Sequence, residues 1–199
     1  MRKGRQIILD RVRSRVLPDR AAPQIDWDRL VRYDDLKAQF CDSAEFVGAK
    51  VHHVDSVATI RRTLEESAEY DSGKVIASTV EGLEGNFSAS QVQSPQEYQS
   101  LDWMLIRGRF GVAENGAIWV PADEVDDRVQ VFITQHLVIV LEAADLEPHM
   151  HAAYQRLGRF EGYGVFVSGP SKTADIEQSL VLGAHGCRTL DIFLIGRCK

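Results

Sequence analysis

The stretch that decides the fold is Val165-Phe166-Val167-Ser168-Gly169-Pro170-Ser171-Lys172-Thr173. Its apolar start predicts a buried strand, and the small residues that follow predict a turn. Residues 176–183 are then predicted to form a helix. A small-residue turn between a strand and a helix directs free backbone N–H groups and the positive end of the helix dipole at one point. The stretch therefore predicts an anion site.

Strands and helices alternate outward from this stretch. Apolar strands that alternate with helices predict a mostly parallel sheet that is covered on both faces. We therefore expect a doubly wound α/β domain over residues 43–199, after an N-terminal helical extension over residues 1–42. A polar connection spans residues 80–100, and connections of this length often act as lids. The predicted strands are 46–54, 74–79, 103–106, 116–120, 137–141, 165–167 and 189–195, and the predicted helices are 27–41, 56–69, 146–157 and 173–184.

Composition limits the class of protein. The chain has 199 residues, of which 44% are hydrophobic and 26% charged, as in soluble globular proteins. No apolar run approaches the roughly 20 residues of a membrane span. The N-terminus has no apolar secretory signal, so a cytoplasmic location is expected. Cys41, Cys187 and Cys198 are too few and too widely spaced for a disulfide framework or a cysteine-based metal site.

Charge is distributed unevenly along the chain. Residues 1–20 carry seven basic and two acidic side chains, a net of +5, which leaves −11 for the rest of the chain. An acidic body would repel phosphates, so nucleic acid is not an expected partner. Ile8, Val12 and Val16 recur at helical spacing and predict an amphipathic helix that docks on the body or on a partner.

Three segments together resemble the LUD domain, the family of lactate-utilisation protein C and its YkgG-like relatives. They are Ala113-Glu114-Asn115-Gly116-Ala117-Ile118, the string from Ser168 to Glu177, and Gly183-Ala184-His185-Gly186. The closing segment from Arg188 to Ile195 also fits the family pattern. The resemblance is best over residues 100–197. The chain departs from the family pattern at Asn115, where Thr is common, and at Cys187, where Pro is common.

The resemblance implies a fold like that of the NagB/RpiA/CoA-transferase group. It also implies a role beside partner subunits in the oxidation of L-lactate, or a related small organic acid, to pyruvate. Iron–sulfur or flavin groups would then be carried by those partners, and this chain would bind no cofactor itself. The chain contains no Walker-type loop, dinucleotide G-x-G-x-x-G or CxxC motif, which favours a non-redox, accessory role.

Glu114-Asn115-Gly116 offers one candidate for catalysis. The three residues resemble the Glu-Asn-Gly motif of class I CoA-transferases, whose glutamate forms a covalent acyl-CoA intermediate, so Glu114 is a candidate nucleophile. Asn115 and Gly116 could instead simply form a type I′ turn that leaves Glu114 solvated.

The predicted anion site has a similar alternative. Its candidate ligand-binding residues beyond Asn115 and Gly116 are Ser168, Gly169, Pro170, Ser171, Lys172, Thr173 and Asp175. Thr173 could instead cap the predicted helix, and Asp175 could offset its dipole.

Histidine supplies the other candidate acid or base. His185 lies between two glycines where the last helix is predicted to end, and it could either face a cleft or bond terminal carbonyls. The remaining histidines, with the acidic residues, show no convincing metal spacing, so no metal site is predicted. Arg107 and Arg109 could grip a carboxylate or could be exposed arginines on an edge.

Three functions remain open. The favoured one is an accessory subunit of lactate-type oxidation that binds partner subunits and holds a small carboxylate or phosphate in a cleft. The alternatives are a stand-alone acyl- or CoA-transferase-like enzyme that uses Glu114, and a non-catalytic regulatory protein that binds a small acid.

Overall fold

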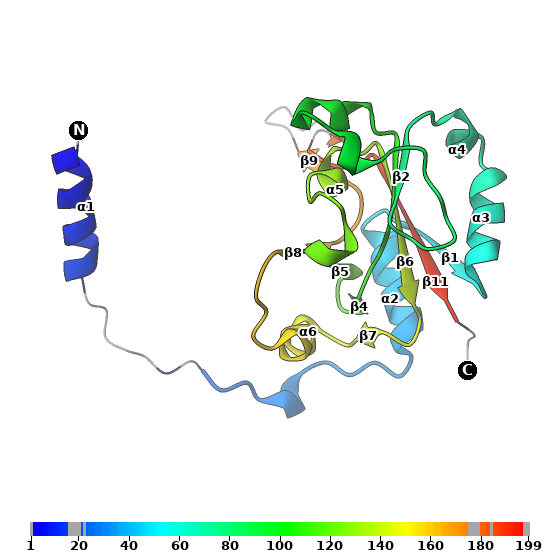
Figure 1. Ribbon diagram of the computed structural model, residues 1–199. Coiled ribbons are helices and arrows are strands. Elements are labelled where there is room, and N and C mark those ends of the chain that lie inside the picture. Colours follow the sequence, from blue (N-terminus) through cyan, green and yellow to red (C-terminus); the bar gives the residue numbers. More distant parts are fainter. Residues whose placement is uncertain (1, 16–20, 22, 175–179, 184, 197–199) are drawn as a thin grey trace. The chain divides into compact units, whose positions relative to one another are not determined.

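Five parallel strands form the main sheet of the computed structural model, in the order β1-β11-β6-β3-β2 (Figure 1). The structure describes residues 2–15, 21, 23–174, 180–183 and 185–196. The first of the described strands pairs with the last of them, and the predicted mostly parallel sheet is confirmed. Its strands are β1 (Lys50–Val54), β2 (Ile76–Ser78), β3 (Trp103–Arg107), β6 (His136–Glu142) and β11 (Thr189–Ile195).

The central strands are mostly apolar because both faces of the sheet are covered. Side chains alternate between the faces of a strand. Ile139 therefore packs in one core with Phe40 of the first covering helix, whereas Val138 packs in the opposite core with Ile60 of the second. These helices are α2 (Leu36–Phe46) and α3 (Val57–Glu65), and the short α4 (Ala68–Ser72) follows α3. The doubly wound arrangement is thus confirmed.

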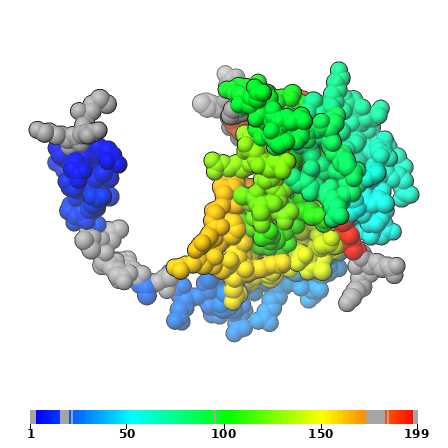
Figure 2. Space-filling model, in the orientation of Figure 1, coloured from blue at the N-terminus to red at the C-terminus, as the bar shows by residue number. Residues whose placement is uncertain are grey.

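A second sheet lies on the same side as α2. Its order is β7-β4-β5-β8, and Ile118 and Val120 of β5 join the core that contains Phe40. Ala153 of α6 packs against the opposite face of this sheet, beside Trp119. The elements are β4 (Phe110–Val112), β5 (Ala117–Pro121), β7 (Leu146–Glu147), β8 (Gly164–Val167) and α6 (Met150–Leu157). In Figure 2, α6 and β8 form the yellow-to-orange part of the surface of this unit.

Capping residues move several helix boundaries away from the predicted ones. The Asp35 carboxylate accepts a hydrogen bond from the backbone N of Ala38, so α2 begins at Leu36. The helix predicted over residues 27–41 is therefore wrong for its first part, where only the short η1 (Trp27–Arg29) forms. The helix predicted over 56–69 divides into α3 and α4, and that predicted over 146–157 is helical only within α6.

The helix predicted over residues 173–184 is wrong. The described residues form a hairpin of β9 (Lys172–Ala174) and β10 (Leu180–Leu182), with Thr173 opposite Val181. The hairpin is anchored at its base, where the backbone N of Gly183 donates to the carbonyl of Ser171. No helix dipole therefore points at Ser168–Ser171 from the described residues, so the dipole part of the argument for the predicted anion site does not hold.

The chain divides into two compact units, residues 1–30 and 31–199. The first contains the expected helical N-terminus, α1 (Arg2–Ser14), whose Ile7, Ile8 and Val12 are exposed. The expected boundary between residues 42 and 43 falls inside α2. Short helical turns occupy the loops of the second unit, namely η2 (Ala89–Gln91), η3 (Pro95–Ser100), η4 (Ala122–Glu124) and α5 (Gln130–Ile133).

Candidate functional site

A pocket of about 470 Å³ brings together three of the predicted site residues, Glu114, Asn115 and Ser168. It lies where the β4–β5 loop and the end of β8 meet α2. Two hydrogen bonds hold these segments together: Ser43 Oγ donates to the carbonyl of Ala113 (2.7 Å), and Ser168 Oγ donates to that of Asn115 (2.9 Å). The other lining residues are Gln39, Asp42, Ser43, Phe46 and Val47 of α2 and its C-terminal end.

The β4–β5 loop is a tight turn that is pressed against α2. Val112 pairs with Ala117, so four residues connect the strands instead of the two of a type I′ turn. Asn115 Oδ1 accepts from the backbone N of Ala117 (3.1 Å). Gly116 has a φ of +64°, and a Cβ there would lie 2.5 Å from the backbone N of Ala44. Gly116 therefore has two structural reasons to be glycine.

Glu114 is tied to the start of α6. Its backbone N donates to the carbonyl of Pro148 (3.1 Å), and its Oε2 accepts from the backbone N of Met150 (2.9 Å). His149 Nδ1 accepts from the backbone N of Ala152 (3.0 Å) at the same helix end. A carboxylate at a helix N-terminus satisfies a free N–H group and offsets the dipole. The geometry thus gives Glu114 a structural role, whether or not it also reacts.

The segment from Ser168 to Lys172 packs on the C-terminal end of α2. Gly169 has a φ of +74°, and a Cβ there would lie 2.5 Å from the carbonyl oxygen of Val47. The Lys172 ammonium and the Pro170 ring both lie against Gly48, just beyond α2. A basic group at the carboxyl end of a helix complements the dipole. Lys172 thus interacts favourably with the protein itself, at a position outside the lining of the pocket.

His185 belongs to a different cluster. Its backbone N donates to Ser171 Oγ (3.4 Å), and the backbone N of Ser171 donates to the carbonyl of Cys187 (2.9 Å). The described lining of the Glu114 pocket includes neither His185 nor Ser171. The structure therefore does not bring Glu114 and His185 together in this pocket. Thr173 lies on β9, and Asp175 lies outside the described residues.

The pocket is apolar and acidic rather than basic. Among its described lining residues, Asp42 and Glu114 carry carboxylates and none carries a basic group. Phe46 has 90% of its surface exposed at this site. Such a pocket suits an apolar or cationic group better than an isolated anion.

The contribution of α2 to the pocket was not predicted from the sequence, since residues 39–47 carry no signal that distinguishes them from any amphipathic helix.

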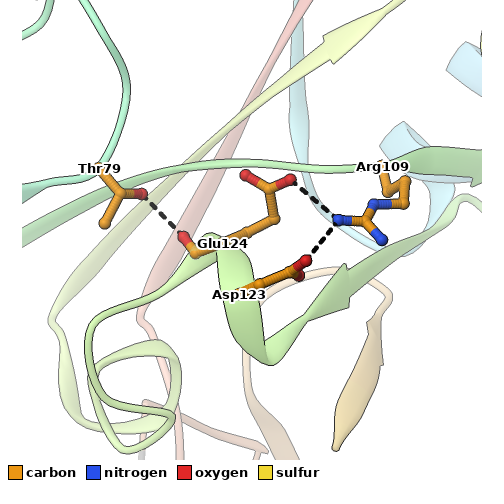
Figure 3. Close-up of polar contacts among 4 residues, drawn as sticks. All are labelled: Thr79, Arg109, Asp123 and Glu124. Atoms are coloured by element: carbon orange, nitrogen blue, oxygen red, sulfur yellow. Dashed lines mark hydrogen bonds and ion pairs between the residues drawn. The ribbon is translucent and has the colours of Figure 1, made fainter. Parts of the chain in front are cut away.

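The two arginines that could have gripped a carboxylate already have partners within the protein. Arg109 forms ion pairs with Asp123 (2.9 Å) and Glu124 (3.5 Å), and the carbonyl of Glu124 accepts from Thr79 Oγ1 (Figure 3). Arg107 lies 3.7 Å from Glu142. Both arginines therefore pair with carboxylates of the protein itself, and Arg107 lies at the end of the interior strand β3 rather than on an edge strand.

Within the part of the chain that the structure describes, no group of three or more His, Cys, Asp and Glu residues could hold a metal ion. No described helix is both long and apolar enough to cross a membrane.

Cys187 is buried, and its burial raises the pKa of the thiol to about 11.

Comparison with known proteins decides the family. Residues 81–195 match the family model described as the LUD domain, which is more than half of the chain. The chain belongs to the LUD-domain family. Glu114, Asn115 and Ser168 lie within the matched residues, whereas α2 lies outside them. The pocket is thus built jointly by the LUD domain and by a helix that precedes it.

Two curated relatives are similar to part of the chain. Lactate utilization protein C of Bacillus pumilus (strain SAFR-032) is 28% identical over 108 residues, which cover 51% of this chain and 45% of that protein. Lactate utilization protein C of Shouchella clausii (strain KSM-K16) is 30% identical over 81 residues, which cover 38% and 35% of the two chains. The matches thus span less than half the length of either relative.

A solved structure supports the fold. The crystal structure of a DUF162 family protein from Deinococcus radiodurans has a TM-score of 0.58 and 15% identity, and it covers 81% of this chain and 96% of that one. At this identity, the likeness shows the fold alone.

Proposed function

We propose that this protein serves the utilisation of L-lactate, or of a related small organic acid, as an accessory component that binds a partner subunit. The observation that carries the proposal is membership of the LUD-domain family, together with relatives that are named lactate utilization protein C. The redox groups, iron–sulfur or flavin, would be carried by the partner. This chain would contribute binding surface.

Exposed apolar side chains support a binding role. Ile8 and Val12 of α1 are 64% and 66% exposed, and because they lie four residues apart they share one face of the helix. Apolar side chains flanked by arginine are typical of interaction surfaces. We therefore assign α1 as the docking helix for the partner.

The test is co-purification from the native host grown on lactate. The full chain carries a tag, and bound proteins are quantified by mass spectrometry at low salt. Iron–sulfur or flavin proteins should be recovered in stoichiometric amounts. The double variant Ile8→Asp/Val12→Asp should lose them. Arg13→Asp, which changes the net charge equally on another face of α1, should retain them. Equal recovery with all three proteins would refute the docking assignment.

The Glu114 enzyme alternative predicts a different result. A nucleophilic glutamate would form a covalent intermediate with an acyl-CoA substrate, detectable as a mass increase on Glu114. The hydrogen bond from Met150 to the Glu114 carboxylate favours the structural role instead. Incubation with acetyl-CoA should therefore leave the mass of Glu114 unchanged.

A further inference from the structure

A second cavity, separate from the Glu114 pocket, lies at the carboxyl ends of β1 and β11. It has a volume of about 390 Å³, within the range of small-molecule sites. In open α/β sheets, ligands bind beyond the carboxyl ends of the parallel strands. Its lining residues are Lys37, His53, Val54, Asp55, Thr59, Arg62 and Gly196.

Basic side chains from three elements surround this cavity. Lys37 comes from α2, His53 from β1 and Arg62 from α3. The amino end of the nine-residue α3 lies at the same place and adds the positive end of its dipole. This grouping contrasts with the acidic chain, whose net charge is −6.

Among the described lining residues one carries a carboxylate, Asp55, and it is already engaged. Asp55 Oδ1 accepts hydrogen bonds from Thr59 Oγ1 (2.6 Å) and Ser56 Oγ (3.2 Å). These hydrogen bonds, with a smaller contribution from Arg62, lower the pKa of Asp55. Asp55 is therefore ionised at neutral pH, and the lining side chains together carry a charge of about +1 with His53 neutral and +2 with His53 protonated, before the nearby Glu45 is counted.

We propose that this cavity binds a small ligand through its carboxylate or phosphate group, held by Lys37, Arg62 and His53. The proposal is independent of the partner role above, because these residues lie outside both the Glu114 pocket and the residues that match the LUD domain. It also places the small acid at a site other than the one predicted from Ser168–Thr173.

Binding at this site is coupled to protonation of His53. Burial, followed by the nearby Lys37, lowers the pKa of His53. An anion between these groups favours the charged imidazole, so it raises that pKa, and by linkage it binds more tightly as the pH falls. The other titratable groups near His53 are Cys41, whose Sγ lies 3.8 Å from Nε2, Glu45 and the adjacent His52.

The experiment follows the His53 ring by NMR in the full chain with labelled histidine. Inorganic phosphate and L-lactate are titrated separately at fixed pH, with chloride holding the ionic strength constant. The pH dependence is then measured with each ligand, and for L-lactate the charge is constant between about pH 5.5 and 8. We expect a saturable rise in the pKa of His53 with at least one of the two. The ligand that gives it identifies the preferred group.

Matched variants separate a site from a general charge effect. Arg62→Gln and Lys37→Gln should each weaken binding about tenfold, which corresponds to about 1.4 kcal/mol. Lys50→Gln removes the same charge at the amino end of β1 and should change binding less than about twofold. Circular dichroism verifies that each variant is folded. The proposal is overturned if neither probe saturates, or if Lys50→Gln weakens binding as much as Arg62→Gln.

Discussion

The carboxylate of Glu114 accepts a hydrogen bond from the backbone N of Met150, across 36 residues of sequence. The contact joins the β4–β5 loop to the first residue of α6. It also places the residue with the most suggestive sequence motif at a helix end, where an acidic side chain is stabilising without any ligand.

Replacing Glu114 should therefore change stability. Glu114→Ala should lower the free energy of unfolding by about 0.5–2 kcal/mol, since a capping acceptor is lost. Glu114→Gln keeps an acceptor oxygen and should lose about 0.3–1 kcal/mol from the missing charge. Urea denaturation measures both, and Glu161→Ala, at an exposed site, should stay within about 0.5 kcal/mol of the wild type. A Glu114→Ala protein as stable as Glu161→Ala would contradict the capping role.

The contact between the β4–β5 loop and α2 predicts a second effect. Gly116→Ala should destabilise the protein by more than Gly82→Ala, by about 1–3 kcal/mol. Both glycines have positive φ, so both substitutions strain the backbone. A Cβ at Gly82 would meet only a Val57 methyl group at 3.2 Å, whereas at Gly116 it would meet the backbone of Ala44. Equal losses in thermal or urea unfolding would show that α2 can move away from the loop.

His136 predicts how stability depends on pH. Burial lowers the pKa of this histidine in the folded protein, and the opposing effect of carboxylates such as Glu69 is smaller. The unfolded chain therefore binds more protons, and stability decreases as the pH falls from about 6.5 through the lower folded pKa. His136→Asn should reduce the loss of unfolding free energy between pH 7 and 5. A slope identical to that of the wild type would show that His136 does not contribute.

The two described cysteines should differ in reactivity. Cys41 is partly exposed, whereas Cys187 is buried with a pKa of about 11, so only about a thousandth of its thiol is ionised at pH 8. In a Cys198→Ser protein, iodoacetamide should modify Cys41 first and Cys187 only after unfolding. Peptide mass mapping over time distinguishes the two. Early modification of Cys187 would show that its environment opens in the native state.

The sheet could be predicted from sequence because its signal is local. The apolar run 137–141 is buried on both faces, and its length and composition suffice to identify a central parallel strand. The family could also be predicted, since the LUD-domain match contains the segments from Ala113 to Ile118 and from Ser168 to Ile195. Both predictions use residues that are close together in the sequence.

The hairpin and the pocket could not be predicted in the same way. Residues 172–182 contain residues compatible with a helix, but hydrogen bonds from Ser171 to Cys187 and from Gly183 to Ser171 hold the strand arrangement. The pocket depends on Ser43 reaching Ala113, 70 residues further along the chain. Spacing within a single segment contains no information about such contacts.

The pairing of β1 with β11 has a consequence for synthesis of the protein on the ribosome. His52 and its partner Asp191 are separated by 139 residues, and β1 pairs only with β11 among the described strands. During translation, β1 must therefore remain without its sheet partner until nearly the whole LUD domain has been made. An early strand with an unpaired edge can form wrong pairs with other chains. Closure of the sheet is thus a late, long-range step that slows folding. Until β11 has been synthesised, the edge of β1 stays open to pairing with other chains.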